Sequence, residues 1–160
     1  MITLRRTFED AAGRLCEKLL PIKQEYYLGR GKYVAICTLS SIDLLRNISR
    51  SYLMSEIAIC GRLLSENKGI DVMINFTLKN PDIRCVVVCG KEVRGHRSGQ
   101  ALLALARNGV DPSGRIIGAL GPNPSLKSSA HTVDTFRRQV IILDMIGTVS
   151  IDKVARALIT

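Results

Sequence analysis

The hydrophobic positions follow a helical repeat near the N-terminus and then change to an alternation of strand and helix patterns. Thr7 and Asp10 form a capping-box pattern, and Pro21 ends the helix that this box begins. We expect residues 1–22 to form an N-terminal helical extension and residues 23–160 to form the main domain. The apolar residues on the predicted helical face are Phe8, Ala12, Leu15 and Leu19.

Beyond Tyr33, short apolar runs alternate with stretches of helical periodicity. The run 84–89 is almost wholly apolar, which is typical of a parallel strand that is covered on both faces. Such alternation predicts βαβ units and an α/β domain with a mainly parallel sheet. We predict strands at 33–39, 56–60, 84–89 and 115–120, and helices at 44–52, 70–78, 98–108, 132–143 and 152–159.

Three glycine-containing loops, 61–69, 90–100 and 118–125, follow predicted strands at the carboxyl edge of the sheet. Right-handed crossovers place the carboxyl ends of the strands on one edge, where open α/β sheets bind ligands. Glycine permits positive φ and close approach of a ligand to the backbone. An ordinary tight turn explains any one of these loops, but three in one domain favour a binding edge.

Known nucleotide-binding fingerprints do not fit these loops. The segment 90–95 lacks the G-x-G-x-x-G spacing, and His96 stands where a phosphate-binding loop requires lysine. A conventional NAD or ATP site is therefore disfavoured.

His96 is one of two histidines, and it lies between Gly95 and Gly99 just before a predicted helix. A neutral imidazole there can ligate a metal while an acceptor holds its other nitrogen. A surface or loop-stabilising histidine is the simpler interpretation of the bare sequence. No Cys or His cluster accompanies His96, which disfavours zinc. A metal carried inside a macrocycle needs only one axial protein ligand.

Composition narrows the classes of function. The net charge is +9, but the 23 Lys and Arg residues are scattered singly or in pairs. Aromatic residues make up 4% and Trp is absent, which argues against stacking on nucleic-acid bases. No apolar run approaches the roughly 20 residues of a membrane span, and no secretory signal is present. We therefore expect a cytoplasmic protein whose five cysteines are mainly small buried hydrophobes.

The block Cys-Gly-Lys-Glu-Val-Arg-Gly-His-Arg-Ser-Gly-Gln that ends at Gln100 is the most specific motif. The stretch 80–100, which contains it, resembles the corrinoid-binding A subunit of tetrahydromethanopterin S-methyltransferase. Segments 65–70 and 108–119 share the resemblance, which runs from about Tyr33 to about Ile146. That family has a Rossmann-like fold, so the resemblance implies a three-layer domain.

The resemblance also implies chemistry. Family members hold a cobamide whose cobalt accepts a methyl group from methyl-tetrahydromethanopterin and passes it to coenzyme M, and the axial histidine matches His96. The chain would then be the corrinoid subunit of a methyltransferase, with other methyltransferase subunits as partners. Members of the membrane complex carry a C-terminal anchor, whereas this chain ends at Thr160 without one, so we expect a soluble homologue. The residues expected at the cofactor are His96, Gly95, Gly90, Gly99, Gln100, Ser65, Glu66, Asn67, Gly118, Leu120, Gly121 and Pro122.

One departure concerns the residue that holds the histidine. Other corrinoid methyltransferases use Asp-x-His-x-x-Gly, in which the aspartate hydrogen-bonds the ligating histidine, but Arg94 occupies that position here. We expect the acceptor to come from a neighbouring loop, with Glu66 and Ser65 as candidates. Two alternative functions stay open: a non-catalytic corrinoid carrier or storage module, and a basic nucleotide- or nucleic-acid-binding domain.

Overall fold

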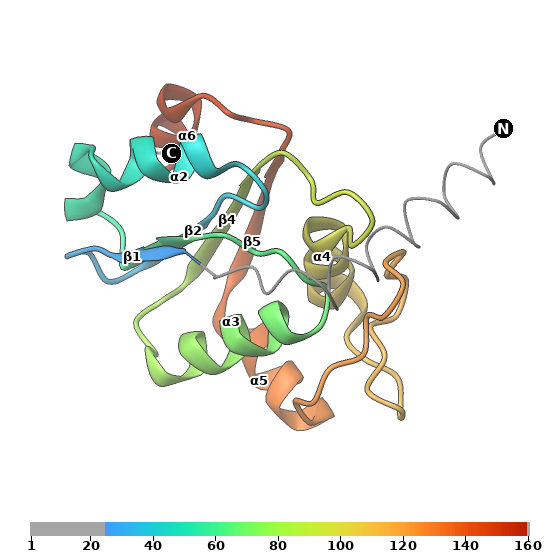
Figure 1. Cartoon of the computed structure of the whole chain (residues 1–160). Coiled ribbons are helices and arrows are strands. Elements are labelled where there is room, and N and C mark those ends of the chain that lie inside the picture. Colours follow the sequence, from blue (N-terminus) through green and yellow to red (C-terminus); the bar gives the residue numbers. More distant parts are fainter. Residues whose placement is uncertain (1–24, 160) are drawn as a thin grey trace, which may run out of the picture.

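The computed structural model of the chain describes residues 25–159, which form a five-stranded sheet with helices on both faces (Figure 1). The predicted extension at 1–22 lies outside the described residues. The strand order is β1-β3-β2-β4-β5, in which β1 is antiparallel to β3 and all other pairs are parallel. The strands are β1 Tyr26–Leu28, β2 Val34–Cys37, β3 Ile59–Gly61, β4 Cys85–Gly90 and β5 Ile141–Ile146.

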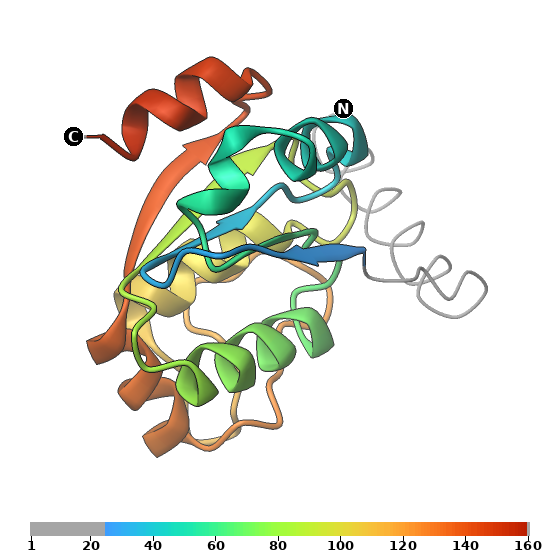
Figure 2. The same cartoon turned by 90° about the vertical axis from the view of Figure 1, so that its left-hand side faces the viewer.

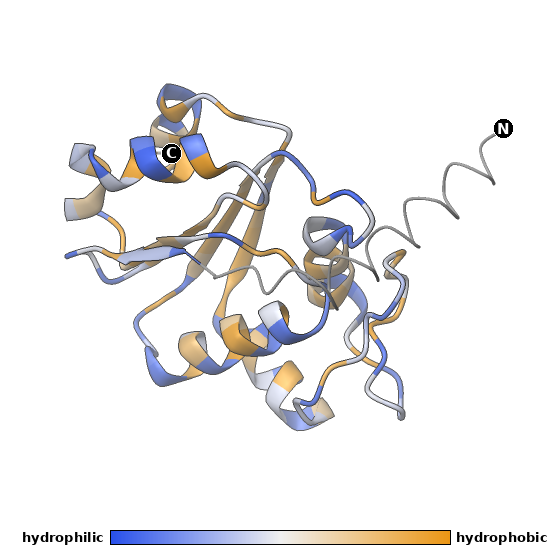
Figure 3. Ribbon diagram, in the orientation of Figure 1, coloured by the Kyte–Doolittle hydropathy of each residue, from blue (hydrophilic) through white to orange (hydrophobic). Residues whose placement is uncertain are grey.

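The helices form the two outer layers, and Figure 2 shows the sheet between them. One layer contains α2 (Ile42–Ser49), the 3-10 helix η1 (Tyr52–Ser55) and α6 (Ile151–Ala157). The other contains α3 (Lys68–Lys79), α4 (Ser98–Asn108) and α5 (Ala130–Gln139). Hydrophobic residues concentrate on the sheet and on the helix faces toward it (Figure 3). The predicted three-layer α/β fold with a mainly parallel sheet is confirmed.

Alternation along β4 builds the two cores. Val86 and Val88 pack into the core beneath α3, α4 and α5, whereas Val87 and Cys89 pack into the core beneath α2 and α6. All four side chains are essentially inaccessible to solvent. Because both faces of this strand are covered, its sequence shows a continuous apolar run rather than alternation.

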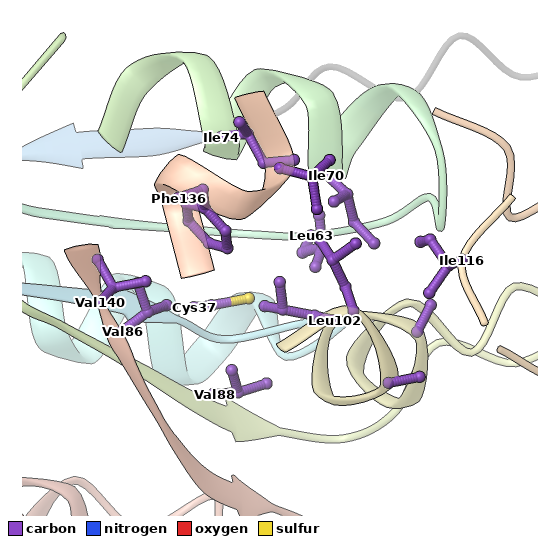
Figure 4. Packing of buried hydrophobic residues seen from close by; sticks show 14 of the residues in the cluster. Cys37, Leu63, Ile70, Ile74, Val86, Val88, Leu102, Ile116, Phe136 and Val140 are labelled. Carbon is purple, nitrogen blue, oxygen red and sulfur yellow. The ribbon is translucent and has the colours of Figure 1, made fainter. Parts of the chain in front are cut away.

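The α3 core shows how helical periodicity becomes packing. Ile70 and Ile74 lie one turn apart on α3 and meet Leu102 from α4 and Phe136 from α5, above Cys37 of the sheet (Figure 4). These side chains are buried to at least 97%. Each large apolar side chain buried in this way contributes about 1.5–3 kcal/mol to folding.

One predicted element is wrong and another is too long. Segment 115–120 is not a strand, because β2 and β5 already occupy both sides of β4. It belongs to the long connection between α4 and α5, tied by isolated bridges between Val110 and Ile116 and between Arg115 and Ser125. The helix predicted at 132–143 ends at Gln139, and β5 follows it.

The remaining differences are smaller. β1 was not predicted at all. The helix predicted at 44–52 ends at Ser49, and the separate turn η1 follows. No helix within residues 25–159 is long and apolar enough to cross a membrane.

The order of the parallel strands places a crevice at the carboxyl edge. From β2 the chain moves outward to β3 and then crosses back to β4 on the other side of β2. The connections that leave β2 and β4 run to opposite faces of the sheet, which is the arrangement that opens a ligand crevice in such folds. A hollow of about 410 Å³ lies at this point, lined in part by Ser40, Ser41 and Lys91.

Candidate functional site

A buried pair of side chains marks the carboxyl edge. Nδ1 of His96, in the loop after β4, lies 2.7 Å from Oε2 of Glu66, in the loop after β3. Glu66 is fully buried and His96 is 7% exposed. Of the two acceptor candidates, the structure therefore pairs Glu66 with the imidazole, whereas Ser65 accepts the backbone N–H of Gly69 in the first turn of α3.

The environment of Glu66 fixes the protonation of this pair. Burial raises the pKa of the Glu66 carboxyl, but hydrogen bonds from His96 and from the Asn123 backbone N–H outweigh it and hold the pKa below its ordinary value of 4.5. An ionised carboxylate only accepts hydrogen bonds, so the proton of the contact resides on Nδ1 of His96. A metal bound by this imidazole would therefore meet Nε2.

A third segment, 118–123, closes over the pair. Oε1 of Glu66 accepts the backbone N–H of Asn123 at 2.8 Å, and Nδ2 of Asn67 donates to the carbonyl of Asn123 at 3.1 Å. From α4, Gln100 donates to the carbonyl of Gly118 and accepts the N–H of Leu120, both at 2.9 Å. The three predicted loops thus do converge, although the third reaches the edge without following a strand.

Close packing at Gly121 excludes a side chain there. A Cβ atom on Gly121 would lie 2.4 Å from the carbonyl oxygen of His96 and 2.9 Å from Cγ of Glu66. Just before the histidine, Gly95 has a φ of +80°, a conformation that glycine adopts without steric cost. Both glycines let backbone approach the pair closely.

The start of α4 holds His96 from the other side. Arg97 adopts a left-handed conformation with φ of +52°, which costs an L-residue about 1–2 kcal/mol. Ser98 Oγ donates to the carbonyl of Leu63 at 2.6 Å and so ties the α4 start to the loop that carries Glu66. Strain of this kind persists where the surrounding structure enforces it, commonly at functional sites.

Sequence reasoning missed the role of Glu92. Its Oε1 accepts the N–H groups of Val93 and Gly99, and its Oε2 accepts the N–H of Gln100. This carboxylate caps the N-terminus of α4, where the helix dipole favours negative charge. The sequence did hold a signal for this role, because Glu92 is an acidic residue shortly before a predicted helix. Asn123 was also missed, because it acts through its backbone.

The other predicted residues lie around this core. Gly90 ends β4 with φ of +79°, Gly99 is buried in the first turn of α4, and Gly118 is exposed with φ of +83°. Leu120 is 44% exposed beside them. Pro122 lies between the two residues that contact the pair, Gly121 and Asn123.

A second cavity reaches this edge beside the loop after β3, where Gly61, Leu63 and Gly69 line it. It has a volume of about 300 Å³ and an apolar lining between the sheet and α3, including Met73, Phe76 and Val86. None of the predicted site residues lines this cavity or the hollow beside Lys91. Within residues 25–159 no group of three Cys, His, Asp or Glu side chains could hold a metal.

Comparison with known proteins shows the family of this chain. A family model that describes the A subunit of tetrahydromethanopterin S-methyltransferase matches residues 16–159. The chain belongs to this family. The resemblance seen in the 80–100 block is thereby confirmed.

Relatives within this family are clearly similar over most of this chain. The A subunit of a putative methyltransferase Mtx from Methanosarcina barkeri is 34% identical over 136 residues, covering 84% of this chain and 69% of that protein. The A 2 subunit of tetrahydromethanopterin S-methyltransferase from Methanothermobacter thermautotrophicus is 40% identical over 124 residues, covering 76% and 65%. The A subunit of the same enzyme from Methanocaldococcus jannaschii is 34% identical over 140 residues, covering 86% and 56%. The chain thus spans between 56% and 69% of the length of these three relatives.

Proposed function

We propose that the chain binds a cobamide at the carboxyl edge of its sheet and carries a methyl group on cobalt. His96 would be the axial ligand through Nε2. The transfer would be of the type that leads from methyl-tetrahydromethanopterin to coenzyme M, with the chain as the corrinoid subunit. The observation that carries the proposal is the 2.7 Å contact between His96 Nδ1 and Glu66 Oε2.

The donor set fits this cofactor. A ligating histidine usually gives its second N–H to a carboxylate, which fixes the tautomer and ring orientation and raises the basicity of the ligating nitrogen. Glu66 is a fully buried carboxylate in contact with Nδ1 of His96, and it would have this effect on a ligating His96. When bound, the cobamide would supply the metal and the methyl-accepting chemistry, and the protein would supply binding, orientation and electrostatics.

The surrounding residues have defined parts in the proposal. Gln100 and Asn67 hold segment 118–123 in place. Exposed Leu120 offers apolar surface beside the buried imidazole. Exposed Gly118, with positive φ, presents bare backbone at the same edge, where a macrocycle requires close approach, whereas Gly95 is buried just before His96.

The visible spectrum of protein reconstituted with a cobamide tests the proposal. We expect His96→Ala to shift the cobalt absorption bands and to weaken cofactor retention about tenfold or more. His131→Ala is the matched control, because His131 is exposed on α5. Circular dichroism of both variants checks that the fold is intact. Identical spectra for the wild type and His96→Ala would refute axial ligation by His96.

A transfer assay then separates a methyltransferase subunit from a storage module. Methylated cobamide is loaded on the isolated chain, and loss of the methyl group to coenzyme M is compared with that from free cofactor. Faster transfer from the protein supports the catalytic role. Binding with transfer no faster than from free cofactor assigns the chain to storage.

A further inference from the structure

The exposed charges around the His96–Glu66 pair are basic. Lys68 begins α3 immediately after Asn67, Lys91 follows β4, and Arg94 lies two residues before His96. Lys127 is attached to the same region, because its backbone N–H donates to Asp71 in the first turn of α3. All four side chains are exposed. We call Lys68, Lys91, Arg94 and Lys127 the basic rim.

The acidic residues of this region face inward. Glu66 accepts from His96 and Asn123, and Glu92 accepts three backbone N–H groups at the start of α4. Asp71 is 9% exposed and accepts from Lys127 and Ser128. These carboxylates have internal hydrogen-bond partners, so the charge presented to solvent is the positive charge of the rim.

The exposed acid that lines the same hollow as Lys91 does not cancel this charge. Asp43, in the first turn of α2, lines the same hollow as Lys91, but its carboxylate lies 3.9 Å from Arg46. At an ionic strength of 0.1 M, fields between exposed charges extend over about 10 Å. An approaching molecule therefore meets mainly the rim.

Apolar side chains lie within reach of the rim. Ile117 is 46% exposed and Leu120 is 44% exposed, on either side of Gly118, which Gln100 holds. An apolar centre with a charged periphery is the anatomy of a protein–protein interface. Single-stranded nucleic acid instead requires aromatic side chains on which bases stack. The exposed tyrosines Tyr26, Tyr27, Tyr33 and Tyr52 lie on β1, before β2 and on η1, and none of them lines the hollow beside Lys91.

We propose that the basic rim docks an acidic face of a partner protein against the His96 edge. This rests on the proposed function, because the partner would be the protein that exchanges the methyl group with this chain. Complementary charge would steer the partner into register and raise the association rate, while Ile117 and Leu120 supply the apolar contact. The partner is thus predicted to carry an acidic ring around an apolar centre.

A charge-reversal pair of variants tests the rim in the full chain without cofactor. The probe is a short fluorescein-labelled poly-L-glutamate peptide, and binding is followed by fluorescence anisotropy at low and at physiological salt. The rim variant carries Lys68→Glu, Arg94→Glu and Lys127→Glu, and it leaves Lys91 in place because Lys91 lines the hollow at the crevice. The control carries Arg30→Glu, Lys32→Glu and Arg84→Glu, three exposed residues at the opposite edge of the sheet, so both variants have the same net charge.

We expect the rim variant to lose about tenfold or more in affinity at low salt and the control to stay within about twofold of the wild type. Equal losses in both variants would show a net-charge effect and would overturn the proposal. So would the absence of binding to wild type at low salt, or tighter binding of an oligothymidylate with the same number of charges. The rim variant should keep the wild-type cobamide spectrum, so failure here is distinguishable from failure of the cofactor assignment.

Discussion

Oε2 of Glu66 and Nδ1 of His96 lie 2.7 Å apart, although 30 residues separate them in the chain. Two parallel strands, β3 and β4, deliver the two residues to one edge of the sheet without being direct neighbours, since β2 lies between them. The contact depends on the topology, on Ser98 tying the two loops and on segment 118–123 covering them. Each of these supports can be tested separately.

Removing the charge of Glu66 should destabilise the fold. In Glu66→Gln the charge-assisted contact to His96 is lost while the size of the side chain is kept, and we expect the free energy of unfolding to fall by about 2 kcal/mol. Chemical denaturation measures this. Glu56→Gln, at an exposed glutamate, should change the same quantity by less than about 0.5 kcal/mol. If Glu66→Gln were as stable as the control, the contact between Glu66 and His96 would not stabilise the fold.

A methyl group at position 121 should disturb the same pair. Gly121→Ala places Cβ against the carbonyl of His96 and the side chain of Glu66, and neither position can yield easily because both are buried. We expect a loss of about 1–3 kcal/mol in denaturation experiments. Ser125→Ala, an exposed position in the same connection, serves as control. An unchanged free energy of unfolding in Gly121→Ala would contradict the close packing at Gly121.

Gln100 should protect the backbone of the covering segment. Leu120 donates its N–H to the Gln100 side chain, so Gln100→Leu should accelerate amide hydrogen exchange at Leu120 by about tenfold. Mass spectrometry or NMR follows this exchange site by site. Asn75→Leu, an exposed position on α3, should leave it unchanged. If the Leu120 amide were equally protected from exchange in both variants, Gln100 would not hold segment 118–123 in place.

The buried thiols should make the protein sensitive to alkali. Burial raises the pKa of both Cys37 and Cys89 from 9.0 to about 12. Below pH 9 the thiols are protonated in both the folded and the unfolded protein. Between pH 9 and 12 only the unfolded protein releases these protons, so the free energy of unfolding falls as pH rises. Each thiol should lower the free energy of unfolding by about 1 kcal/mol per pH unit in that window.

Denaturation at several pH values measures this slope. The double variant Cys37→Ala, Cys89→Ala should show a shallower decline, although its packing defect lowers stability at neutral pH. The same decline with and without the two thiols would exclude them as its cause.

The sheet was predictable where a buried strand has its own unambiguous run. The run 84–89 became β4, and the periodicity at 70–78 became α3. Strand β5 could not be predicted, because Val140 and Leu143 continue the helical spacing of Val133 and Phe136. Only the pairing with β4, which the local pattern does not encode, decides for a strand.

The candidate site could likewise be predicted only in part. Glu66 was foreseen as an acceptor for His96 because both follow strands at one edge. The contacts of Asn123 and Gln100 depend on the path of the α4–α5 connection, which short-range patterns do not determine. The apolar run at 115–120 resembled a strand, but the sheet had no place for it.

The most direct test of the central claim is electron paramagnetic resonance of cobalt(II) cobamide bound to protein in which histidine is labelled with nitrogen-15. Axial ligation by His96 predicts that each cobalt line is split into a doublet by the labelled nitrogen, and into a triplet in unlabelled protein. A triplet that persists in the labelled protein, or no nitrogen splitting at all, would contradict ligation by His96.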